Sequence, residues 1–197
     1  MIYCKVPLRI SFVGGGTDHI NYSKNVGSVI SISIDKFVYV FLNKSWEHSY
    51  KLSYSKKENV SSINQINHPI FRECLKYFKI YKGIELSSVA DIHSRGSGLG
   101  SSSSFTVCLI KIFNKFLNIK MKDNEIANLA SEIEIKKCKK FIGKQDQFQA
   151  AFGGFNQFNF NSDGSVSVNK IKINKNRFDL FKKKLVIYST GKFRKAD

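Results

Sequence analysis

The sequence has few prolines, few cysteines and no long apolar run. Its two prolines and 13 glycines among 197 residues exclude a collagen-like or linker-dominated chain. The four cysteines and four histidines show no metal-ligand spacing, so we expect neither a disulfide scaffold nor a protein-bound zinc site. No apolar run reaches the ~18–20 residues that cross a bilayer, and the N-terminus lacks the layout of a secretory signal. We therefore expect a soluble, cytoplasmic protein with no membrane partner.

Acidic residues are also scarce. The 15 Asp and Glu stand against 32 Lys and Arg, which gives a net charge of +17. Such an excess attracts polyanions, including nucleic acid and phosphorylated substrates. A nucleic-acid surface clusters its charge, whereas these lysines are spread from Lys5 to Lys195. We favour solvated lysines and a composition bias over a polyanion-binding surface, and we expect no nucleic-acid partner.

The hydrophobic share of 42% is typical of a globular protein, and the length suits one large domain or two small ones. Alternating apolar residues predict strands, and apolar residues at spacings of three and four predict helices. The expected strands span 2–13, 28–42 with 51–55 as its partner, 84–92, a hairpin within 155–173, and 185–189. The expected helices span 69–80, 105–117, a segment capped by Asp123, and 144–152. This order predicts an α+β fold with mixed or antiparallel pairing.

A loop rich in glycine and serine follows the strand expected at 84–92. It runs Gly96-Ser97-Gly98-Leu99-Gly100 and then through four serines into an apolar helix. Glycines let backbone N–H groups approach a ligand closely, and the helix adds unpaired N–H groups and a positive dipole end. The spacing is neither that of a Walker A loop nor that of a dinucleotide-binding motif. We interpret the loop as a cradle for nucleotide phosphates in preference to a flexible linker.

The second candidate is Glu134, on the helix expected from Asp123. With Ile126 at 0° and ~100° per residue, Glu134 lies near about 80°, at the border of the apolar stripe, and Glu132 lies near about 240°, on the opposite face. A half-buried carboxylate requires a partner, which a metal ion or a lysine would supply. A surface ion pair of Glu134 with Lys137 or with another neighbour of Cys138 is the alternative.

Asp146 lies in the segment Gly143-Lys144-Gln145-Asp146-Gln147, at the expected start of a short helix. The helix dipole alone would favour an acid there. The segment is nevertheless unusually polar for a place just before an apolar turn. A carboxylate there can accept a hydroxyl proton during phosphoryl transfer.

The third motif covers residues 7–18. It places Arg9 inside an apolar strand and ends in Gly14-Gly15-Gly16-Thr17-Asp18. The glycines permit close backbone approach, and a carboxylate can accept two hydrogen bonds from sugar hydroxyls. A tight turn capped by Asp18 explains the same residues nearly as well.

Taken in this order, the three motifs resemble those of the GHMP kinase superfamily, and more closely those of its D-glycero-D-manno-heptose 7-phosphate kinase branch. The similarity runs from about residue 5 to residue 191. It implies a kinase that uses ATP and Mg²⁺ to phosphorylate a hydroxyl of a sugar phosphate, in heptose synthesis for surface polysaccharide. The fold that it implies is α+β and similar to domain 2 of ribosomal protein S5. One stretch, Lys139-Lys140-Phe141-Ile142, departs from the more glycine-rich pattern of the family.

The resemblance also implies roles for individual residues. Asp146 would be the catalytic aspartate with Arg9 near the reacting centre, and Ser102 and Glu134 would bind Mg²⁺. The nucleotide would contact Arg95, Gly96, Ser97, Gly98, Leu99, Gly100, Ser101, Ser102 and Ser103. The sugar would contact Gly15, Gly16, Thr17, Asp18 and Lys144.

Family members continue well beyond this length. Residues 1–197 are therefore expected to form one N-terminal, ATP-binding domain that ends near the junction with a C-terminal domain. With half of the cleft missing, we expect little activity from the chain alone, and either self-association or complementation by a C-terminal domain. The alternatives are an inactive ATP-binding remnant, one chain of a split kinase, or a basic nucleic-acid-binding protein. Glu134 and Asp146 favour the kinase-related hypotheses over a nucleic-acid-binding protein.

Overall fold

The structure, a computed structural model, describes residues 1–19, 22, 26–81, 83–92 and 97–188. Its strands form one mixed sheet in the order β4-β3-β5-β2-β6-β7, with β1 also paired to β2. The strands are β1 (Ile2–Val13), β2 (Gly27–Lys44), β3 (Tyr50–Ser53), β4 (Lys57–Val60), β5 (Ile84–Ala90), β6 (Phe155–Phe160) and β7 (Val166–Lys170). Each pairing is antiparallel except that of β3 with β5. The expected α+β class with mixed pairing is confirmed.

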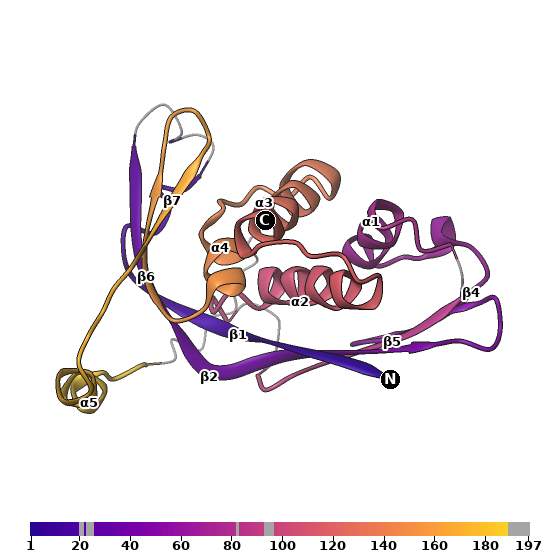
Figure 1. The fold of residues 1–197 in the computed structure, drawn as a ribbon, viewed down its shortest axis with the longest axis horizontal. Helices are drawn as coiled ribbons and strands as arrows, with labels where there is room; N and C mark the ends of the chain where they lie inside the picture. The colour runs from indigo at the N-terminus through magenta and orange to yellow at the C-terminus, as the bar shows by residue number, and fades with distance from the viewer. Residues whose placement is uncertain (20–21, 23–25, 82, 93–96, 189–197) are drawn as a thin grey trace.

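The helices α1 to α4 cover one face of this sheet (Figure 1). One short irregular helix precedes α1 and another follows α3, and α5 lies apart from α1 to α4 at the other end of the molecule. The bounds are η2 (Ile63–Gln65), α1 (Pro69–Tyr77), α2 (Ser101–Phe116), α3 (Asp123–Ser131), the π-helical η3 (Glu132–Lys137), α4 (Gln145–Phe152) and α5 (Lys175–Lys184).

Strand β2 is the long central strand of the sheet. It is rich in β-branched and aromatic residues that alternate in burial, as a strand with one covered face requires. One edge of β2 pairs with β1 along its length, and the other edge pairs first with β6 and then with β5. The register of β1 shifts between Pro7 and Arg9, where the proline has no N–H for the ladder.

Helix α2 packs against β1 and β2 on one side and against α3 and α4 on the other. It is apolar almost all round, and Val107, Leu109, Ile110 and Phe113 are fully buried. Cys108 is buried among them, as expected for a small core residue. The central helix therefore holds the start of its first turn at a fixed place above the sheet.

Several expected elements are wrong in detail. Strand β3 pairs with β4 and β5 instead of β2, because β1, β5 and β6 already occupy both edges of β2. Helix α2 begins at Ser101, four residues earlier than expected. The N-cap of α3 is Lys122, so Asp123 lies in the first turn and is not the cap.

The C-terminal part also differs from the expectation. Leu185–Tyr188, the described part of the strand expected at 185–189, is not in a strand and is largely exposed, so little burial stabilises it there. Helix α5 precedes it and was not expected. Asn174 caps α5 by accepting a hydrogen bond from the Arg177 N–H (2.9 Å), and Phe181 packs edge-on against Phe12.

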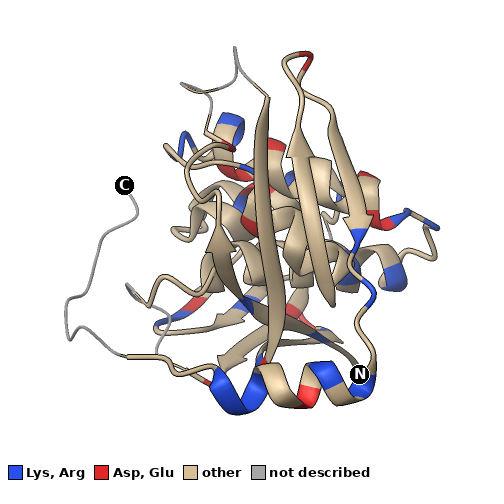
Figure 2. Cartoon of the chain, turned by 90° about the vertical axis from the view of Figure 1, so that its left-hand side faces the viewer, with Lys and Arg blue, Asp and Glu red and all other residues tan. Residues whose placement is uncertain are grey.

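Basic residues lie on many elements. Figure 2 shows Lys and Arg scattered over the visible face, with several of them on α5 at its lower edge. Within the described ranges, no helix combines the length and the apolar character needed to cross a bilayer.

Candidate active site

The phosphate loop leads directly into α2. Gly98 and Gly100 have φ of +69° and +76°, in the left-handed region that glycine adopts without strain. Ser101, Ser102 and Ser103 form the first helical turn, whereas the sequence analysis placed them in the loop. N–H groups in a first turn have no partner within the helix, so this correction strengthens the expected anion site. Arg95 and Gly96 lie outside the described residues.

Arg9 ties β1, the loop and α4 together. Its backbone N–H donates to the Leu99 carbonyl (3.1 Å), and its Nη1 donates to the Gly98 carbonyl (2.5 Å). Its Nε and Nη2 both lie 2.7 Å from Oδ1 of Asp146. A Cβ on Gly100 would lie only 3.3 Å from the other Asp146 oxygen. The structure thus places the two expected catalytic residues in contact, beside the phosphate loop.

Burial raises the pKa of Asp146, and the Arg9 guanidinium acts in the opposite direction. The negative charges of Asp18 and Glu134 also raise this pKa. A carboxylate of raised pKa is a stronger proton acceptor than an ordinary surface aspartate. About a quarter of the Asp146 side chain is exposed (25%), so the carboxylate stays within reach of a ligand.

Glu132 is exposed, as the helical wheel predicted, and Glu134 is fully buried (0% exposed), which is deeper than the predicted position at the border of the apolar stripe. Oε1 of Glu134 accepts hydrogen bonds from Ser102 Oγ (3.0 Å) and Lys140 Nζ (2.7 Å). Its Oε2 accepts one from Gln147 Nε2 (2.7 Å). The expected lysine partner is therefore Lys140, and the alternative with Lys137 is wrong.

Glu134 lies in the π-helical turn η3, and not in the regular helix assumed by the wheel. π-Helical turns are rare in proteins, and those that do occur often lie at functional sites. The turn places Ile133 and Glu134 on the buried side, while Lys136 and Lys137 face solvent. The predicted side of Glu134 was right although the predicted backbone geometry was not.

The triglycine segment forms a tight turn. Thr17 Oγ1 donates to the Gly14 carbonyl (2.8 Å), and Oδ1 of Asp18 accepts from the Gly16 N–H (3.2 Å). Oδ2 of Asp18 accepts from the Gln145 N–H (2.9 Å), which links this turn to the start of α4. The turn function left open by the sequence is therefore present. It does not exclude sugar binding, since a carboxylate oxygen can accept more than one hydrogen bond.

Two cavities lie beside this turn. The smaller, of 190 Å³, is lined by Gly16, Asp18 and Asp146 together with His19 and residues 142, 143 and 145. The larger, of 490 Å³, is lined by Thr17, Asp18 and Lys144, among others. Gly15 lies near the Ser11 hydroxyl and the Gln145 amide, since a Cβ there would be 3.9 Å from each.

In the described part of the chain, Lys144 makes no hydrogen bond or ion pair with Asp146. Its Nζ donates to the Gly164 carbonyl (2.7 Å) in the turn between β6 and β7. Burial lowers its pKa, and the positive charge of Lys136 adds to this effect. Lys144 therefore belongs to the larger cavity, on the side of Asp18 that faces the β6–β7 turn.

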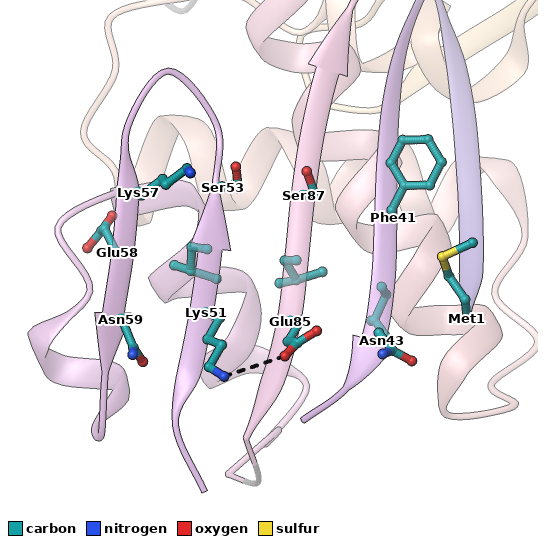
Figure 3. A pocket seen from close by; sticks show the side chains of 13 residues that line it. Met1, Phe41, Asn43, Lys51, Ser53, Lys57, Glu58, Asn59, Glu85 and Ser87 are labelled. Atoms are coloured by element: carbon teal, nitrogen blue, oxygen red, sulfur yellow. Dashed lines mark ion pairs between the residues drawn. The ribbon is translucent and has the colours of Figure 1, made fainter. Parts of the chain in front are cut away.

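A third and larger hollow, of 640 Å³, lies far along the sheet from these residues. Figure 3 shows it on the strands β2 to β5, with the ion pair of Lys51 and Glu85 (3.7 Å) across neighbouring strands. Its Leu42, Leu52 and Leu86 belong to the core. None of the expected site residues lines it, so it plays no part in the site.

Two residues of the site escaped the sequence analysis. Gln147 was noted only for its polarity, but it is fully buried and hydrogen-bonded to Glu134. Lys140 was noted only as a departure from the family pattern. The available signal for Gln147 was the run of polar residues that opens α4, and Gln149 on the same helix is buried as well. For Lys140 the sequence offered none, because an irregular segment brings it back to Glu134.

Comparison with known proteins finds similarity to one kinase family. Residues 64–154 match the family model described as GHMP kinases N terminal domain. The site described above lies partly in that segment and partly in β1, which precedes it. The match covers the middle of the chain and agrees with the resemblance to GHMP kinases that the sequence motifs predicted.

Individual relatives point to the heptose branch. The chain is 32% identical over 209 residues to D-glycero-alpha-D-manno-heptose 7-phosphate kinase of Campylobacter jejuni, covering 99% of this chain and 61% of the relative. Its fold matches the crystal structure of a D-glycero-D-manno-heptose 1-phosphate kinase from Bacteriodes thetaiotaomicron, with a TM-score of 0.84, 29% identity, and coverage of 91% of this chain and 62% of the other. The chain thus spans about three fifths of the length of these relatives.

More distant structures share the fold. The mevalonate kinase of Methanococcus jannaschii matches with a TM-score of 0.68 and 23% identity, covering 87% of this chain and 56% of the other. The expected N-terminal fold of GHMP kinases is therefore confirmed.

Proposed function

We propose that this chain is the ATP-binding part of a kinase that transfers the γ-phosphoryl group of ATP to a hydroxyl of a sugar phosphate, with a heptose phosphate as the substrate class. One observation carries the proposal. The loop at the N-terminus of α2, the Arg9–Asp146 pair and the buried Glu134 come from distant parts of the sequence and meet at one place. The names of the heptose kinases among its relatives support the choice of substrate.

The first turn of α2 supports the binding of the nucleotide phosphates. The N–H groups of Ser101, Ser102 and Ser103 are positioned for anionic oxygens, and the helix dipole adds a favourable field. A Cβ on Gly98 would meet no atom of the described residues within 4 Å, which leaves space on the side of the loop where a ligand would approach. Ser97, Leu99 and Gly100 complete the loop.

The residues around Glu134 fit Mg²⁺. Carboxylate, hydroxyl and amide oxygens are the ligands that Mg²⁺ prefers, and this site offers Glu134, Ser102 and Gln147. Oε1 of Gln147 is buried and has no hydrogen-bond partner among the described residues, so one oxygen of the set is unused. The described residues hold no group of three or more His, Cys, Asp and Glu side chains, so the cation would also depend on phosphate oxygens. When bound, Mg²⁺ supplies positive charge that neutralises the phosphates during transfer.

We propose that Asp146 accepts the proton of the sugar hydroxyl. As that proton moves to the Asp146 carboxylate, the hydroxyl oxygen forms a bond to the γ-phosphorus, and the bond from that phosphorus to the bridging oxygen breaks to release ADP. Arg9 orients the carboxylate through its two contacts at 2.7 Å. The small cavity that Asp146 shares with Gly16 and Asp18 is the proposed place of the reacting hydroxyl.

The sugar itself would occupy this cavity and the larger one beside it. We propose that Gly15, Gly16, Thr17 and Asp18 contact the sugar and that Lys144 contacts its more distant part. Asp18 lines both cavities, which makes it the shared contact between the two.

The test is phosphoryl transfer from [γ-³²P]ATP in Mg²⁺ to a panel of acceptors that contains a heptose 7-phosphate, a hexose phosphate, an unphosphorylated heptose and homoserine. The proposal predicts slow transfer by this chain that favours the heptose phosphate over the other acceptors, and loss of that transfer in Asp146→Asn with ATP binding retained. Binding of ATP without transfer to any acceptor would support the inactive remnant or split kinase instead. Transfer to homoserine alone would refute the proposed substrate class.

A further inference from the structure

Lys140 is held more tightly than a surface lysine. Its Nζ lies 2.5 Å from Ser102 Oγ and 2.7 Å from Glu134 Oε1, and its side chain is only 22% exposed. These two oxygens are the ones proposed above to bind the divalent cation. The structure therefore already holds a cation between them, supplied by the chain itself.

The backbone is built to bring this ammonium back to Glu134. Lys139 has a φ of +54°, in the left-handed region that residues other than glycine rarely adopt. This reverses the chain after η3, and the Lys140 N–H donates to the Glu134 carbonyl (3.0 Å). Lys140 is thus fixed to the same residue through its backbone and through its side chain. The fold of the backbone therefore determines the position of the Lys140 ammonium.

A metal ion on the same oxygens would lie very close to this ammonium. The two oxygens are 3.0 Å apart, and Mg²⁺ binds oxygen at about 2.0–2.1 Å. With the Lys140 nitrogen at 2.5 and 2.7 Å from these oxygens, a metal ion bound to both would lie no more than about 3.6 Å from it. Two cations at that distance repel strongly in a buried site. Metal ion and ammonium therefore cannot both keep their best positions.

We propose that Lys140 occupies the place of the divalent cation in the nucleotide-free chain, and that a metal ion must displace its ammonium from Ser102 and Glu134. This inference rests on the proposed function, and it deepens it by naming how the metal site is regulated. Without the ammonium, Glu134 would be a fully buried carboxylate with no positive partner, which is costly. Lys140 thus stabilises the empty site and lowers its affinity for free metal ions. A metal ion that arrives with the nucleotide brings phosphate oxygens as further ligands, which favours the exchange.

The competition can be measured without nucleotide and without activity. Mn²⁺ is a suitable probe, because electron paramagnetic resonance measures the concentration of the free ion directly. The variants are Lys140→Met, which keeps the length of the aliphatic chain, and Lys140→Gln, whose amide can still donate to Glu134 and so preserves folding if the methionine variant is unstable. Lys139→Gln is the matched control, since Lys139 is an exposed neighbour with the same charge.

The proposal predicts that both Lys140 variants bind Mn²⁺ at least about tenfold more tightly than the natural chain, because a repelling charge has been removed. Lys139→Gln should bind it as the natural chain does. The double variant Glu134→Gln with Lys140→Gln should lose the gained affinity, which locates the new binding at this site. Millimolar Mg²⁺ should also raise the melting temperature of Lys140→Gln more than that of the natural chain.

Equal Mn²⁺ affinity of the natural chain, Lys140→Gln and Lys139→Gln would overturn the inference. So would an equal gain in Lys139→Gln, because the effect would then be a loss of net charge. The outcome is independent of the transfer assay. A chain that transfers phosphate but shows no gain in Lys140→Gln refutes the inference alone, and a chain that shows the gain but neither binds ATP nor transfers phosphate refutes the proposed function alone.

Discussion

Replacement of Glu134 by glutamine should destabilise the chain strongly, and the same change at Glu132 should not. The Glu134 carboxylate is fully buried and accepts hydrogen bonds from Ser102, Lys140 and Gln147. A glutamine has nearly the same shape, but it removes the negative charge and adds two N–H donors among groups that are themselves donors. Glu132 is exposed, so its replacement changes neither packing nor a buried contact.

The magnitude follows from which contacts can be repaired. Gln147 has an unused oxygen, so a flip of its amide would let it accept from the new glutamine and restore one hydrogen bond. The charge pair with Lys140 cannot be repaired. Removal of one partner from a buried pair costs about 3–5 kcal/mol, and the 22% exposure of Lys140 lets water compensate in part. We therefore expect a loss of about 3 kcal/mol in the free energy of unfolding.

Urea denaturation of the natural chain, Glu134→Gln and Glu132→Gln measures this difference directly. Glu132→Gln should remain within about 0.5 kcal/mol of the natural chain, as exposed substitutions usually do. A free energy of unfolding that is the same in both variants would refute the reasoning, because it would mean that the Lys140–Glu134 pair contributes nothing to the fold.

Two further outcomes test the surroundings of the site. Burial lowers the pKa of His68 from 6.5 to about 4, helped by the charge of Lys140, so the unfolded chain takes up a proton below pH 6.5 that the folded chain resists. The free energy of unfolding is therefore highest above pH 6.5 and falls toward pH 4, by about 2 kcal/mol between pH 7 and pH 5. The variant His68→Asn can still cap α1 but has no group that titrates in this range. Urea titrations at the two pH values should show that it removes most of this difference. At Gly143 an added Cβ would lie 1.9 Å from a carboxylate oxygen of Asp18. Gly143→Ala should therefore break the Asp18–Gln145 hydrogen bond and lower the free energy of unfolding by about 1–3 kcal/mol. A change below about 0.5 kcal/mol would contradict the close packing.

The sequence predicted those parts of the fold that local periodicity controls. The alternation within β2 and the apolar surface of α2 leave little choice of structure, so both elements were located, although α2 begins four residues earlier than expected. The partner of β3 could not be predicted, because strand pairing depends on which edges of β2 other strands have already taken. Helix α5 was missed because its apolar content is mainly two phenylalanines among lysines, and its position depends on the distant Phe12.

The site was predictable to a similar extent. Asp146, Glu134 and the loop were recognisable because each combines a polar group with an element whose periodicity is clear. The contact of Arg9 with Asp146 joins residues 137 positions apart, so no spacing rule could reveal it. The contact of Lys140 with Glu134 could not be predicted for another reason. A π-helical turn and the left-handed residue Lys139 direct Lys140 toward Glu134, and neither feature has a sequence signature.

The central claim is that the loop at the N-terminus of α2 binds the phosphates of ATP. Calorimetric titration of Mg²⁺–ATP into the natural chain, Gly98→Val and Gly154→Val tests it most directly. The two glycines are matched, with φ of +69° and +74° and no atom within 4 Å of an added Cβ, so valine causes a similar backbone strain at each. We predict that the natural chain and Gly154→Val bind ATP, and that Gly98→Val loses the binding because its side chain blocks the approach of the phosphates. Unchanged affinity in Gly98→Val, in a chain that remains folded, would contradict the account.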